Sequence, residues 1–461
     1  MPTFFSLHVA MSGLRAHQHA LSVTAHNIAN AGTQGYHRQS PRFIAGNPLT
    51  GAFAMSGIGV PQLGTGVTVE SIERMQSQYI DNQIRTAGQW REMWNYRDQA
   101  LKQLEAVLSE PSSFGLSDVL NKFWNSWEDL SVSPEDLSTR ISVIESGVAL
   151  ADRIGSLHRS LRDFQTRADQ DIVDNAGQIN RLAHEIAHLN DQITRSSAGG
   201  YQPNDLLDRR DVLLDQLAGI AQVQISGTGG SDLYVSISGK TLIQANLVNE
   251  ITVIQGDNGW SKLVWVEDGS DVHISGGSVR GQMQIRDAVI EGYIQDLDRI
   301  ARAIVDRVNE VHSTGITIEG LPAGNFFVPG GSASDMRVEA TPLTLAVTSP
   351  DDDPIFNSLP QAMSAIRNEA LIDGETIGGA YSGLVGRIGS HSREAASRAE
   401  GHTLSLHQLR AQRESISGVS IDEEMLNMVK YQQAYNASAR IATVIDEMID
   451  TIISRTGVGG R

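Results

Sequence analysis

The chain has 461 residues, with 54 acidic against 36 basic side chains and a formal net charge of -18 at pH 7. This negative balance argues against broad attraction to nucleic acid or to an anionic membrane, and the absence of cysteine excludes disulfides. At this length we expect several domains, and we find neither a signal-peptide core nor an apolar run long enough to cross a bilayer.

The first predicted element is an amphipathic helix that ends near Gly32, a natural helix stop. Apolar side chains recur along it at helical spacing and form one stripe. No acidic residue occurs before Glu70, so this helix is basic. The predicted stripe comprises Leu7, Met11, Leu14, Leu21 and Ile28.

Residues 40 to 70 are rich in Gly and Pro and predict an extended arm punctuated by turns. Helical periodicity then resumes and continues to about residue 217, with one long helix over roughly 140 to 196. Large aromatic side chains in this region are expected to lie in a core between long helices. They are Trp90, Trp94, Phe123, Trp124 and Trp127.

Between residues 222 and 280 the apolar period changes to two, and short apolar runs are separated by Asp/Asn-Gly and Gly-Gly turns. This pattern predicts a small antiparallel β domain. Helical spacing returns from Ile290 to Val311, so the β domain is inserted into a helical one. Residues 316 to 375 carry no clear period, and we expect them to extend the β domain.

A second amphipathic helix closes the chain. Ser420 and Glu423 form a capping box at its start. Its acidic side chains complement the basic first helix, so the two terminal helices are predicted to pair in a coiled coil. The predicted seam comprises Met425, Met428, Gln432, Tyr435, Ala439, Ala442, Ile445, Ile449 and Ile452.

One pattern suggests an enzyme, because His184-Glu185-Ile186-Ala187-His188 fits the HExxH zinc-protease motif. The continuation that would supply a third ligand is absent, since Asp191 and Thr194 stand where metzincins need Gly and His. Helical spacing also places both histidines opposite an apolar stripe, on a solvated face. We therefore expect no metal site, no cofactor and no catalysis. The pairs Asp205/Asp208 and Asp208/Asp211 alternate with arginines and are interpreted as helix ion pairs.

Three stretches carry a family resemblance. Residues 27 to 39 (NIANAGTQGYHRQ) resemble the amino-terminal signature of the bacterial flagellar axial proteins, which comprise rod, hook and hook-associated proteins. Residues 417 to 425 (SGVSIDEEM) and 431 to 440 resemble the carboxy-terminal helix of that family. Residues 203 to 211 (PNDLLDRRD) are similar to a segment typical of hook-associated members and foreign to rod and hook proteins.

The resemblance implies a structural subunit of the flagellum at the junction of hook and filament. It implies export in an unfolded state through the flagellar type III apparatus, to an extracellular location. The implied partners are copies of the chain in a ring, hook protein, hook-associated protein 3 and an export chaperone at the carboxy-terminal region, with no nucleic acid and no membrane. The resemblance also places Asn27, Asn30, Gly35 and Tyr36 in the assembly interface formed by the two apolar stripes.

The predicted fold is mainly α with an inserted all-β domain. Residues 1–45 with 405–461 would form the terminal coiled coil, and 46–221 with 281–315 and 376–404 a bundle of long helices. Residues 222–280, with 316–375, would form the β domain. Two alternatives to the junction subunit stay open: a zinc metalloprotease on a flagellar scaffold, and a hook or distal-rod protein.

Overall fold

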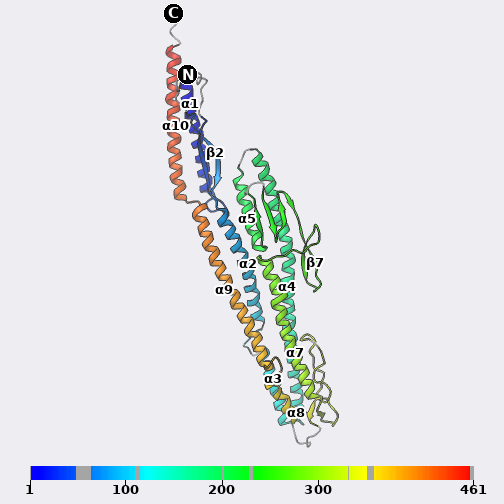
Figure 1. The fold of residues 1–461 in the computed structure, drawn as a ribbon. Helices are drawn as coiled ribbons and strands as arrows, with labels where there is room; N and C mark the ends of the chain where they lie inside the picture. The colour runs from blue at the N-terminus through cyan, green and yellow to red at the C-terminus, as the bar shows by residue number, and fades with distance from the viewer. Residues whose placement is uncertain are drawn as a thin grey trace.

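The computed structural model describes residues 2–47, 64–108, 110, 112, 115–199, 202–227, 232–330, 332–349 and 358–456. The fold is mainly helical with small antiparallel sheets, and the molecule is elongated (Figure 1). Both ends of the chain lie at one tip of it, and helices α3 and α8 lie at the other. Along the described residues, no helix has the length and the apolar character needed to cross a membrane.

The terminal unit consists of helices α1 (Pro2–Ala29) and α10 (Ile421–Thr456) with a two-stranded antiparallel sheet. The helices lie side by side along most of their length, and strands β1 (Gln39–Ala45) and β2 (Val67–Arg74) pack against α1. The predicted arm at 40 to 70 thus contains this strand pair, while its residues 48–63 lie outside the described ranges. Ser420 Oγ accepts from the Glu423 N–H, which confirms that side of the capping box.

The helical body is built from long helices. They are α2 (Gln78–Leu108), α3 (Leu116–Val132), α4 (Leu137–Ala198), α7 (Glu291–His312) and α9 (Ile377–Ser417). Helix α4 confirms the long helix predicted over roughly 140 to 196. Its apolar residues repeat at helical spacing, so they lie on one face, and that face is buried. Trp94, Phe123, Trp124 and Trp127 are buried, as expected. The expectation for Trp90 was wrong: its side chain is 40% exposed and stacks on His402 of α9.

The predicted β region contains two small antiparallel sheets beside the carboxy-terminal half of α4. One joins β3 (Gln224–Ser226), β4 (Tyr234–Ile237), β5 (Lys240–Gln244) and β6 (Leu247–Val248), and the other joins β7 (Ile251–Gln255) and β8 (Ser261–Trp265). The apolar run at residues 272–274 forms no strand there. Their inward side chains share one hydrophobic cluster with α4 and with α5 (Asn204–Ile220). The strands therefore use the helices as the second layer of their core.

Helical structure resumes with α6 (Gly277–Gln284) and a single π-helical turn, Ile285–Ile290, that leads into α7. Beyond α7 the described part of 316–375 contains β9 (Ile316–Thr317), β10 (Ala346–Thr348), α8 (Ser358–Ala365) and a short 3-10 turn, Ile366–Asn368. Phe326, Phe327 and Met336 of this region belong to the hydrophobic cluster of the helical body and not to that of β3–β8. The domain boundaries given above remain predictions, and this packing argues for grouping 316–349 with the helices.

Candidate assembly interface

Small side chains bring the two terminal helices together. A β-carbon added at Gly13 would lie 3.0 Å from Ser438 Oγ of α10, so the backbones approach closely there. The neighbouring turns of α1 bury side chains that are also mostly small, against α10 and the β1–β2 sheet. They are Ala10, Ala16, Ala20 and Val23. Hydropathy alone does not find this face, because it ranks alanine and glycine below leucine.

The predicted stripe of α1 lies to one side of this contact. Leu7, Leu14, Leu21 and Ile28 are half-buried and Met11 is 39% exposed. Leu7 and Met11 line an open cavity of about 860 Å³ between α1 and β2. Part of the predicted stripe thus remains available to a partner.

The predicted seam residues of α10 also differ from one another in how far they are exposed. Ile445 is buried, while Met428, Tyr435, Ala439, Ala442 and Ile449 are half-buried. Met425, Gln432 and Ile452 are exposed. A second apolar row, which the sequence pattern did not single out, runs along the outside of α10. It comprises Leu426, Val429, Ile441, Val444 and Met448 together with Ile452, and we name it the outer ridge.

Beneath the helix pair lies a network of buried polar groups, the polar junction, which begins at Asn27 (1% exposed). The Asn27 amide donates to the Gln39 carbonyl and to Glu424 Oε2, both at 2.9 Å. Its oxygen accepts from the Tyr36 hydroxyl at 2.7 Å and from the Gln39 N–H at 3.0 Å. Asn27 therefore joins α1, the turn that follows it, β1 and α10.

Arg38 fastens the start of α10 from the other side. Its Nε donates to Glu424 Oε1 at 2.9 Å, and its Nη1 donates to Glu423 at 2.8 Å. Its backbone N–H donates to the carbonyl of Ser417, the last residue of α9. Because Glu424 is 2% exposed, its charge depends on these donors for compensation.

The same turn is fixed to α5 of the helical body. The His37 ring lies 2.8 Å from Asp208 Oδ1 and its backbone N–H donates to Asp208 Oδ2, while the Gln39 amide donates to Asp205. Gly35 has a φ of +80° and packs against Val212 so closely that any side chain would clash. Asn30 caps the end of α1, where its amide donates to the His26 carbonyl at 3.1 Å.

Asp208 and Asp211 of α5 bond to arginines from other elements, which corrects the expectation that they form ion pairs within the helix. Arg74 of β2 donates to both Asp208 and Asp211, and Arg85 of α2 donates to Asp211 and Asp215. Helical spacing alone gave no sign of these distant partners. Residues from three of the stretches that carry the resemblance, 27–39, 203–211 and 417–425, thus converge on a single network.

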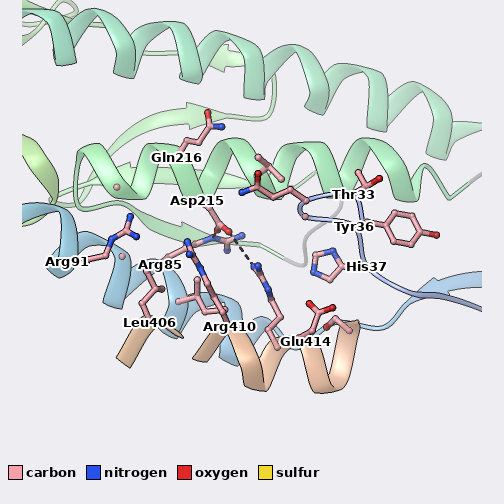
Figure 2. A pocket seen from close by; sticks show the side chains of 18 of the residues that line it. Thr33, Tyr36, His37, Arg85, Arg91, Asp215, Gln216, Leu406, Arg410 and Glu414 are labelled. Atoms are coloured by element: carbon pink, nitrogen blue, oxygen red, sulfur yellow. Dashed lines mark hydrogen bonds and ion pairs between the residues drawn. The ribbon is translucent and has the colours of Figure 1, made fainter. Parts of the chain in front are cut away.

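An open cavity of about 780 Å³ lies beside the polar junction (Figure 2). The turn bearing Thr33 and His37 lies at one end of it, with Arg85 of α2 and Asp215 of α5 along its walls. Burial, with the nearby carboxylates of Asp205, Asp208 and Glu424, raises the pKa of Tyr36, which keeps its hydroxyl a donor to Asn27. Burial likewise raises the pKa of Asp81 at the start of α2.

Metal-ligating side chains come together at one place in the described part of the chain, where His37, Asp208 and Asp211 bring their ligand atoms within 4.8 Å of one another. Arg74 already donates to both carboxylates there, so a guanidinium supplies the positive charge. His184 and His188 are both exposed on α4, opposite its buried stripe, as predicted. His184 lies 2.7 Å from Glu250, and the described residues provide no group of three ligands around it.

Comparisons with known proteins agree with this arrangement. The family model for the flagellar hook-associated protein FlgK helical domain matches residues 101–327. Models for the flagella basal body rod protein and for the flagellar basal body rod FlgEFG protein C-terminal match residues 7–37 and 410–455, which lie mostly in the terminal helices.

Relatives match along nearly the whole chain. Flagellar hook-associated protein 1 of Bacillus subtilis is 31% identical over 100% of this chain and 99% of its own length. The Escherichia coli protein of that name is 26% identical over 96% and 98%. The solved structure of the flagellar hook junction protein FlgK from Burkholderia pseudomallei covers 73% of this chain and 100% of its own, with a TM-score of 0.67 and 14% identity, and shows a shared fold. The chain belongs to the family of flagellar hook-associated protein 1.

Proposed function

We propose that this chain is a structural subunit that joins the hook of the bacterial flagellum to its filament. The observation that carries the proposal is the terminal unit: α10 presents exposed apolar side chains on its outer face, while Glu424 at its base is bonded to Asn27 of α1 and to Arg38 of the turn that follows α1. Exposed apolar side chains that gather on one face of a helix mark contacts with other proteins. The names of the full-length relatives support the same role.

In this proposal residues 1–45 with 405–461 are the assembly domain, and the α1–α10 pair acts as a coiled coil. The subunits form a ring, with hook protein on one side and hook-associated protein 3 on the other. Before export the carboxy-terminal region binds a chaperone, and the assembled protein is extracellular. A hook or distal-rod role is set aside, because the relatives that match the full chain are hook-associated proteins.

The proposed role requires no catalysis. The HExxH residues lie on a solvated face of α4, and His184 is bonded to Glu250 instead of pointing toward a ligand group. A hydrolytic zinc site needs three protein ligands and an open position. No observation favours the metalloprotease alternative, and zinc analysis of the purified chain tests it directly.

A strain that lacks the chain provides the main test. Electron microscopy should show hooks without filaments. Filament protein should accumulate in the medium, because it is exported but has no junction on which to assemble. A plasmid copy of the chain should restore filaments. Normal filaments in the deletion strain would contradict the proposed role.

A further inference from the structure

The terminal unit and the helical body are joined covalently at two neighbouring places. Strand β2 continues into α2 through residues 75–77, and α9 continues into α10 through residues 418–420. Both links lie against Arg38, whose backbone N–H donates to the Ser417 carbonyl at 2.9 Å and whose carbonyl accepts from the Met75 N–H at 2.8 Å. Two links this close together act as a hinge, because they do not prevent rotation about the line that joins them.

Helix α5 supplies the contact that such a hinge lacks. It lies at the base of the terminal unit, on the other side of α2 from α9 (Figure 1). Its leucines at 213, 214 and 217 share a hydrophobic cluster with α4 and the strands of the β region, so α5 belongs to the body. Another face of α5 meets the terminal unit. We name that face the α5 bracket, which comprises Asn204, Asp205, Asp208, Asp211 and Val212.

Helical geometry explains how one helix serves both regions. At 100° per residue, the bracket residues 204, 205, 208, 211 and 212 fall within roughly 120° of arc. The three leucines at 213, 214 and 217 are centred on the opposite side of the helix. Helix α5 therefore packs on the body with its apolar face and bonds to the terminal unit with its polar face.

Asp208 is the central residue of the α5 bracket. Its carboxylate accepts from the backbone N–H of His37 at 3.1 Å and from Arg74 Nη1 at 2.8 Å, and it lies 2.8 Å from the His37 ring. The Asp208 side chain is 8% exposed and that of Arg74 is 6% exposed. When one member of a buried ion pair is removed, the charge of the other loses its compensation. Asp208 therefore contributes more to the bracket than an exposed carboxylate would.

The other bracket residues bond to the terminal unit around this pair. The Asn204 amide donates to the Ile72 carbonyl at 2.8 Å, and Asp205 accepts from the Gln39 amide at 3.0 Å. Asp211 accepts from Arg74 Nη1 at 2.9 Å, and Val212 packs against Gly35. Apart from Val212 these contacts are polar, so their release exposes little apolar surface. The terminal unit can therefore separate from α5 while the core of the body stays intact.

We infer that the α5 bracket sets the direction in which the terminal unit leaves the body, with Asp208 as the positioning residue. The contact blocks rotation about the hinge at Arg38 and holds the two regions of one copy at a single angle. Its consequence for assembly rests on the proposed function: a subunit whose terminal helices already point in the required direction loses less conformational freedom when it joins the junction.

The distance between two spin labels on the purified chain tests the inference, and introduced cysteines can carry the labels because the natural chain has none. Gln433→Cys on α10 and His188→Cys on α4 are both at exposed positions. Their distance distribution should be narrow. Asp208→Ala should broaden it by about twofold or more, because the terminal unit then samples several directions. Asp205→Ala is the matched control, since Asp205 lies on the same face of α5 but is 64% exposed, and it should leave the width unchanged.

A second pair of labels within the terminal unit, Ala25→Cys on α1 with Gln433→Cys, should keep its narrow distribution when Asp208→Ala is added. If Asp208→Ala prevents folding, Gly35→Ala makes the same test from outside the body. A β-carbon at Gly35 clashes with Val212 and leaves every charge of the bracket in place. Two results would overturn the inference: the distribution between α10 and α4 stays narrow in the folded variant, or the pair within the terminal unit broadens as well.

Filament counts separate this inference from the proposed function. Cells with Asp208→Ala should carry fewer filaments than cells with Asp205→Ala. Equal filament numbers, with a broadened distance distribution in the purified Asp208→Ala chain, would overturn the consequence for assembly. Filaments in a strain without the chain would instead refute the proposed function, and the label distances would still decide whether the bracket sets the direction of the terminal unit.

Discussion

The helical body and the terminal unit are both built from long helices, yet they bury different kinds of side chain. The body surrounds large aromatics such as Trp127 and Phe123, each fully buried. Along α10 the only buried side chains among those described are Glu424 and Ile445. Apolar burial is the main source of folding free energy. We infer that the body is stable alone, while the terminal unit is held by small buried side chains and a few polar contacts until partners cover it.

A matched pair of leucine truncations tests that contrast and should give the largest effect. Leu150 on α4 is fully buried and Leu426 on α10 is 72% exposed. Leu150→Ala should lower the free energy of unfolding of the purified chain by about 3 kcal/mol. Leu426→Ala should change it by less than about 0.5 kcal/mol but reduce filament number. Urea unfolding and electron microscopy measure the two effects, and equal losses of stability would remove the contrast.

The polar base of α10 provides the next test. Glu424→Ala leaves the Asn27 amide and the Arg38 guanidinium without their buried acceptor, which should weaken docking of α10 by about 3 kcal/mol. Glu423→Ala removes a more exposed acceptor from the same arginine and should cost less than about 1 kcal/mol. Hydrogen exchange along α10 measures both. Equal protection in the two variants would show that Glu424 does not hold the helix.

The close approach of α1 and α10 predicts a smaller effect at Gly13. Gly13→Leu forces a side chain against Ser438 and should cost about 1 to 3 kcal/mol of α1–α10 docking. Gly401→Leu provides the control, because Gly401 is also within a helix but has open space around it. Limited proteolysis should release α10 faster in the first variant only. Similar cleavage of both would indicate that the helix contact tolerates bulk.

These sites also show what the sequence could predict. The long helix α4 was recognised because its apolar residues repeat strongly over many turns. The face of α1 that packs on α10 was not, because Gly13 and Ala20 carry little hydropathy signal although they permit the closest approach. Contacts such as Asn27 with Glu424 join residues nearly four hundred positions apart. The spacing of apolar residues cannot predict such a distant pair, so only the family resemblance pointed to the residues involved.

Acid should weaken the docking of α10 on α1. His17 of α1 stacks on Tyr431 of α10, and burial lowers its pKa from the usual 6.5. A histidine whose folded pKa is lowered binds protons more readily when undocked, so docking is favoured above pH 6.5 and weakens as the pH falls below it. Hydrogen exchange of α10 between about pH 7 and pH 5 should show this loss, and His17→Phe should reduce it. An unchanged pH response in that variant would rule out His17 as its source.

The smallest effect is expected on the exposed surface of the body, at the HExxH residues of α4. Exposure alone does not mark a functional surface: the outer ridge exposes apolar groups that water solvates poorly, whereas Glu185 exposes a carboxylate that water solvates well. Glu185→Gln should therefore change the free energy of unfolding by less than about 0.5 kcal/mol and leave filament number unchanged. Urea unfolding and filament counts measure both, with Leu426→Ala as the exposed substitution expected to reduce filaments. Stoichiometric zinc in the purified chain, or a proteolytic activity lost on Glu185→Gln, would show that the body also carries a function. It would contradict the assignment of function to the terminal unit alone.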